Sequence, residues 1–164
     1  MKAVLLIVIS LLYFSSTMNA EEKDDEFFST VIGINYNYST ENDDAFLGFD
    51  LQLKESYKRF IIGFDTGIFY GLESPDDISL FTIRPSLGFY AYGDNKSTFK
   101  VIMSMSSGLL VGEDLKNGMT PYGTMSSIGF DVFYKKVGLT VRGINANSSV
   151  YNNRFGQIGF KFGF

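Results

Sequence analysis

Apolar and polar side chains alternate at every second position in eight successive segments of this 164-residue chain. Successive side chains of a β-strand point to opposite faces, so this period predicts strands with one apolar and one polar face. No segment with helical periodicity competes with these eight. The expected strands cover residues 28–38, 47–54, 60–70, 81–89, 99–109, 122–134, 137–142 and 157–164.

The connections between these segments alternate in length. Short turns are expected at 55–58, 93–97 and 135–136, and longer polar loops at 41–44, 71–77, 112–121 and 145–153. An up-and-down barrel with short turns at one end and longer loops at the other produces this rhythm. The sequence therefore predicts an all-β, eight-stranded antiparallel barrel with both termini at the short-turn end. Pro85 cannot donate to a strand ladder, and we expect a β-bulge there.

The first twenty residues are expected to lie outside the fold. Lys2 precedes an apolar run at residues 3–14, and small or polar residues, with the exception of Met18, follow it up to Ala20. This layout is typical of a secretory signal peptide, because the run is too short to cross a bilayer as a helix. The alternative is an amino-terminal membrane anchor. We expect a signal peptide at 1–20, an acidic leader at 21–26 and the barrel at 27–164.

Alternation alone does not say which face of the barrel points outward. A soluble ligand-binding barrel buries its apolar face, whereas a membrane barrel exposes that face to lipid. Aromatic residues gather near the strand ends with aliphatic residues between them, as in the interfacial girdles of membrane proteins, which favours lipid. The polar face mixes charges of both signs with glycine and serine, which suits a narrow interior. The expected interior charge cluster comprises Asp50, Asp65, Arg84, Asp131, Arg142 and Lys161.

The composition bears on the chemistry that is available. The chain has no Cys and no His, and its net charge of -4 argues against a nucleic-acid partner. We expect no catalytic residues, no cofactor and no metal site. Ser104, Ser106 and Ser127 are interpreted as small interior residues, and the acidic loop residues lack the spacing of a calcium-binding loop.

The last strand carries the most specific pattern in the sequence. Apolar residues stand at two-residue steps up to the carboxyl terminus, at Ile158, Phe160, Phe162 and Phe164. With the export signal and the eight strands, this pattern resembles the small outer-membrane barrels of the OmpA/OmpX type, without their periplasmic domain. The resemblance implies a bacterial outer-membrane location with both termini periplasmic. It also implies that the barrel-assembly machinery reads the terminal aromatic row.

The resemblance further implies a non-enzymatic integral membrane protein with a structural or surface-interaction role, such as an adhesin or a host-factor binder. A small transport channel, similar to the OmpW type, and a secreted soluble ligand-binding barrel are the alternatives. Because eight strands leave a lumen just wide enough for side chains, the mixed-charge interior favours a closed barrel. The expected partners are outer-membrane lipid and lipopolysaccharide, the assembly machinery, and a host or surface ligand at the loops. We expect a monomer.

Overall fold

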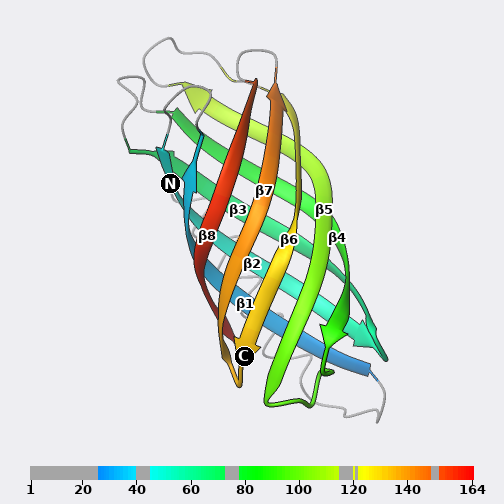
Figure 1. The fold of residues 1–164 in the computed structure, drawn as a ribbon. Helices are drawn as coiled ribbons and strands as arrows, with labels where there is room; N and C mark the ends of the chain where they lie inside the picture. The colour runs from blue at the N-terminus through cyan, green and yellow to red at the C-terminus, as the bar shows by residue number, and fades with distance from the viewer. Residues whose placement is uncertain (1–25, 40–44, 73–77, 115–119, 121, 149–151) are drawn as a thin grey trace.

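The computed structural model describes residues 26–39, 45–72, 78–114, 120, 122–148 and 152–164. Eight antiparallel strands follow one another around a closed barrel, and β1 pairs with β8 to complete it (Figure 1). The strands are β1 (Glu26–Tyr38), β2 (Ala45–Tyr57), β3 (Phe60–Gly71), β4 (Ile78–Tyr92), β5 (Phe99–Asp114), β6 (Tyr122–Tyr134), β7 (Val137–Ser148) and β8 (Asn152–Gly163). The expected all-β, eight-stranded antiparallel architecture is confirmed. Among the described residues there is no helix that could cross a membrane.

Three short connections lie at one end of the barrel, together with the carboxyl terminus (Figure 1). Two of them are two-residue turns, Lys58–Arg59 and Lys135–Lys136, in which the first lysine has a φ of 54° and 55°, respectively. The prediction of a turn at 55–58 is wrong at its beginning, because β2 continues to Tyr57 and the turn begins at Lys58. Although Glu55 and Ser56 are polar, they continue the alternation of β2, with Glu55 exposed and Ser56 buried.

The remaining short connection, between β4 and β5, is held by Asp94. Its carboxylate accepts hydrogen bonds from the Ser97 hydroxyl at 2.7 Å and from the Lys96 backbone N–H at 3.0 Å. The hydroxyl bond, assisted by the backbone bond, holds the pKa of the exposed Asp94 carboxyl below its usual value.

The interior is divided into three layers along the barrel. Near the short-turn end lies an apolar layer, made of Val31, Ile61, Tyr90, Ile102 and Phe133. A charged layer occupies the middle of the barrel. Towards the long-loop end lies a second apolar layer, made of Phe46, Phe69, Leu80, Leu110, Met125, Ile144, Ala146 and Phe155. The polar face predicted to fill the lumen therefore shares it with two apolar layers.

The second apolar layer explains an error in the expected loop at 145–153. The structure continues β7 to Ser148 and starts β8 at Asn152. The alternation persists there with its polarity reversed, because Ile144 is buried while Asn145 is exposed. Polar outward residues at a strand end look like a loop in the sequence, although the backbone pairing is unbroken from Asn145↔Arg154 to Asn147↔Asn152.

The bulge expected at Pro85 is also wrong. Pro85 pairs in register with Phe64 of β3, and the pairing of β4 with β5 resumes without a shift at Ser86↔Ser106. The register shift lies instead between Tyr90 and Tyr92. The missing N–H of Pro85 costs the ladder a donor, but it requires no extra residue in the strand.

Candidate functional site: the charged interior and the outward face

The charged middle layer is centred on Asp131 of β6, which is fully buried. Its carboxylate contacts the Lys161 ammonium at 2.7 Å, the Arg142 guanidinium at 2.9 Å and the Lys54 ammonium at 3.4 Å. These three cations come from β8, β7 and β2. One carboxylate thus joins side chains from four strands across the lumen.

Arg142 extends this network across the barrel to Asp65 of β3, which lies 3.4 Å from its guanidinium. The same guanidinium donates to the hydroxyl of Ser104 at 3.0 Å and to that of Thr140 at 3.2 Å. Thr140 in turn donates to Asp131 at 2.7 Å. The donors of Arg142 are therefore shared among two carboxylates and two hydroxyls.

A second pair lies beside this network. The Arg84 guanidinium is 3.8 Å from the carboxylate of Asp50, which also accepts a bond from the side-chain amide of Asn35 at 2.6 Å. Lys161 donates to the Gln52 side chain at 3.1 Å. All six residues proposed from the sequence for the interior cluster are buried, and each forms an ion pair within it.

Sequence reasoning left Lys54 out of the cluster. Lys54 is buried, and with it four cations face three carboxylates in the layer. Its parity could have placed it there, since it follows Asp50 and Gln52 at two-residue steps on β2. Asn35 and Thr140 are uncharged, and no feature of the sequence separates them from other inward polar residues.

The arrangement compensates the buried charges, and few of its side chains remain available for a chemical reaction. A buried carboxylate among cations is compensated, whereas removing one partner would leave an uncompensated charge in a low-dielectric interior. The inward hydroxyls of Ser106 and Ser127 bond to each other at 2.9 Å. Within the described ranges, no group of three or more metal-ligating side chains could hold a metal ion.

The outward face is apolar over most of the barrel. Ile62, Leu109 and Ile158 expose 63%, 68% and 60% of their surface, respectively, although they stand within paired strands. The terminal row lies on this face, since Ile158, Phe160, Phe162 and Phe164 are all exposed. The backbone of Phe164 also donates to the carbonyl of Thr30 at 2.9 Å, which ties the terminus to β1.

Aromatic residues cluster at the two ends of this outward face. The short-turn end carries Tyr57, Phe60, Tyr92, Phe99 and Tyr134. The long-loop end carries Tyr36, Tyr38, Tyr70 and Tyr122. Two aromatic belts at the edges of an outward apolar band are typical of barrels that span a bilayer.

Comparison with solved structures identifies the architecture. The outer membrane enzyme PagL matches with a TM-score of 0.64 at 12% identity, over 80% of this chain and 98% of that chain. Neisserial surface protein A (NspA) matches with a TM-score of 0.60 at 14% identity, over 87% and 98%. The N-terminal β-barrel domain of Pseudomonas aeruginosa OprF matches with a TM-score of 0.53 at 11% identity, over 83% and 97%.

This is the fold of the small outer-membrane β-barrels. No protein-family model matches the sequence, and no curated protein matches it. The likeness to the outer-membrane barrels therefore lies in the fold.

Proposed function

We propose that the protein is a non-enzymatic integral outer-membrane barrel with a structural or surface-interaction role. The observation that carries the proposal is the reversed distribution of polarity. Ile158 and Phe160 are about 60% exposed on the outside, while Asp131 and Lys161 are fully buried inside. Such a continuous apolar exterior would drive aggregation in water, whereas in a bilayer it contacts the lipid acyl chains.

The proposed orientation places the short-turn end in the periplasm. β1 begins and β8 ends at this end of the barrel, as do the three short turns. Outer-membrane barrels have short periplasmic turns and longer extracellular connections, which supports this orientation, with β1 beginning and β8 ending on the periplasmic side.

The lumen supports a closed barrel over a channel. The Asp131 network spans the interior, and an apolar layer lies on each side of it. An ion following this path would have to cross an apolar layer to reach the Asp131 network. We therefore place the structural or surface role ahead of transport.

The serine contacts support a non-enzymatic role. Ser104 accepts a bond from Arg142, and Ser106 and Ser127 bond to each other, so these hydroxyls bond to groups that cannot act as a general base. The sequence contains no His.

The membrane assignment is tested by expressing the full chain in a Gram-negative host. We expect the protein in the outer-membrane fraction, with an electrophoretic mobility that shifts on boiling because the closed barrel resists detergent when unheated. Recovery as a soluble periplasmic protein without a heat shift would overturn the proposal and favour a soluble barrel.

The surface role is tested with the connection between β5 and β6. Replacing residues 115–119 by a glycine-serine linker should leave the heat shift intact and reduce the adhesion of expressing cells to host cells or matrix. If cells with the wild-type protein adhere no better than cells without it, the surface-interaction role fails and the structural role is the one supported.

A further inference from the structure

The aromatic belt at the long-loop end is one-sided. On β1 to β4 the outward positions near this end carry apolar and aromatic side chains, at Tyr36, Tyr38, Leu47, Tyr70 and Phe81. On β6 to β8 the corresponding positions, apart from Tyr122, are polar, at Thr124, Ser126, Asn145, Asn147, Asn152 and Arg154. Of the described residues on β7 and β8, none places an aromatic ring on the outer face at this end.

The strand register gathers part of this polar surface into one row. Ser107, Ser126, Asn145 and Arg154 are consecutive partners across β5, β6, β7 and β8. Along β8, Arg154 lies two residues closer to the long-loop end than Gly156, which is the register partner of Tyr38. Arg154 therefore stands close to the level of the tyrosine belt, where lipid headgroups meet the acyl region.

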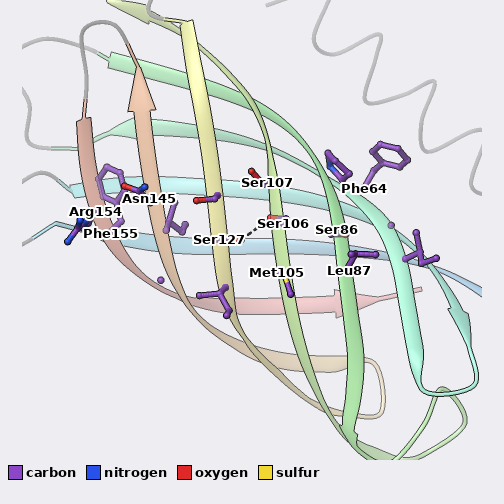
Figure 2. Close-up of a pocket in the computed structure, with 17 residues that line it drawn as sticks. Phe64, Ser86, Leu87, Met105, Ser106, Ser107, Ser127, Asn145, Arg154 and Phe155 are labelled. Atoms are coloured by element: carbon purple, nitrogen blue, oxygen red, sulfur yellow. Dashed lines mark hydrogen bonds between the residues drawn. The ribbon is translucent and has the colours of Figure 1, made fainter.

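A hollow in the outer wall leads to this arginine (Figure 2). Phe64 and Leu87 lie towards one end of the hollow, Met105 borders its middle, and Asn145 and Arg154 lie at the other end. The hollow thus runs from apolar side chains in the middle of the band to a cation and an amide at its edge.

Two glycines keep the wall below Arg154 shallow. A Cβ on Gly143 would have no other atom within 4 Å, and one on Gly156 would meet only the Tyr38 carbonyl oxygen, at 4.0 Å. Tyr38, Val141 and Ile158 border a second depression at Gly156. No side chain from β7 or β8 fills this space.

Arg154 differs from the other exposed cations. Those on the described residues lie at the short-turn end, at Lys58, Arg59, Lys96, Lys135 and Lys136. Arg154 is exposed, and it forms no ion pair with any residue that the structure describes. A guanidinium offers a planar pair of donors that matches a phosphate group.

We propose that the outer face of β6 to β8 binds one phosphate-bearing lipid of the outer leaflet. The phosphate lies on the guanidinium of Arg154, beside the side-chain amide of Asn145. One acyl chain lies in the hollow, passing over Gly143 towards Met105. This site rests on the proposed membrane function, since the chain and the headgroup must meet the barrel at the height of the belt.

A second copy of the chain fits this face less well. In a two-fold contact the same patch would meet itself, so a surface that carries Arg154 would face another one. Of the acids whose side chains the structure describes, the exposed ones, Glu55 and Asp94, lie at the short-turn end, away from Arg154. An anionic lipid supplies a charge opposite to that of Arg154.

The test titrates purified full-length protein in detergent micelles with bisphosphorylated lipid A and counts bound lipid by native mass spectrometry. We expect one tight lipid A, with Arg154→Gln weakening its binding about tenfold, the loss expected for one charged hydrogen bond. Lys136→Gln, which removes an exposed cation at the other end, should leave binding unchanged. Gly143→Leu should weaken binding with every charge retained, because its side chain would occupy the hollow over which the acyl chain passes.

Several results would overturn the site. Equal binding by Arg154→Gln and wild type would do so, as would an equal loss in Lys136→Gln, which would indicate unspecific attraction. Displacement of the lipid by millimolar inorganic phosphate would show a headgroup-only site, and a dimer that excludes lipid A would assign the face to a second copy. Heat-shift gels of each variant separate these outcomes from a failure of the membrane proposal, in which the wild type itself would show no folded barrel.

Discussion

At the scale of single residues, Asp131 carries most of the interior electrostatics, because three buried cations lie within 3.4 Å of its carboxylate. Asp131→Asn keeps the shape and removes the charge that compensates them. We expect it to lower the free energy of unfolding by about 3–5 kcal/mol, the usual cost of leaving buried charges unpaired. Urea unfolding in lipid vesicles measures the loss.

Two comparisons give this prediction its controls. Asp50→Asn should cost less, since its nearest cation, Arg84, stands 3.8 Å away. Arg59→Gln, in an exposed turn, should change stability by less than about 0.5 kcal/mol. Equal losses for Asp131→Asn and Arg59→Gln would show that the network does not stabilise the barrel.

Lys135, like Lys58, has a strained left-handed backbone conformation. Its φ of 55° lies in the left-handed region, which a side chain with a Cβ occupies at a cost of about 1 kcal/mol or more. Its ammonium lies 5.8 Å from the Tyr134 ring, which offsets part of this cost. Lys135→Gly should therefore raise stability by up to about 1 kcal/mol, measured by the same urea unfolding. The control Lys136→Gly has no left-handed φ to relieve and should be destabilising; a gain in both variants would refute the strain argument.

At the scale of elements, β8 is the strand that closes the barrel. Phe164 is exposed and contributes one backbone bond to β1, whereas Phe155 is buried with its ring 5.3 Å from that of Phe46. Deleting Phe164 should therefore change the stability of a folded barrel by only about 1 kcal/mol. By the family resemblance, the same deletion should lower the outer-membrane level markedly.

Phe155→Ala is the matched control, with the opposite expectation. It should cost about 3–5 kcal/mol of stability because it opens a cavity in the second apolar layer, while the terminal aromatic row stays intact. Immunoblots of outer-membrane fractions measure the level of both variants. Normal insertion without Phe164, together with a larger insertion defect in Phe155→Ala, would remove the assembly role from the terminal row.

The elements also show how far sequence reasoning reaches. Period-two alternation predicted all eight strands. Apolar residues such as Leu139 and Val141 stand on the same face of a strand for as long as that face remains in one environment. The strand prediction failed beyond Gly143, where the polar Asn145 points outward and the apolar Ile144 points inward. Alternation separates the two faces of a strand, but it does not show which of them points into the barrel. The partners of Asp131 could not be predicted, because they depend on barrel shear, which brings β2, β7 and β8 to one depth.

At the scale of the whole molecule, the layered interior predicts a barrel that does not conduct. The Asp131 network and the two apolar layers lie across the lumen between its two ends. Planar-bilayer recordings of the purified protein should therefore show no stable single-channel steps. Large, long-lived steps would contradict the closed lumen and favour a transport role.

The proposed function requires the apolar face of the barrel to point towards lipid. The chain allows a direct measurement of this direction because it contains no Trp. Phe160→Trp places a single fluorophore on the outward face, where Phe160 is 59% exposed, and Phe133→Trp places one inside, where Phe133 is 3% exposed. Both variants are reconstituted into vesicles whose acyl chains carry bromine, a contact quencher. We expect strong quenching of the Phe160→Trp protein and weak quenching of the Phe133→Trp protein. Weak quenching at position 160, or stronger quenching at 133, would show that the apolar face does not lie against lipid.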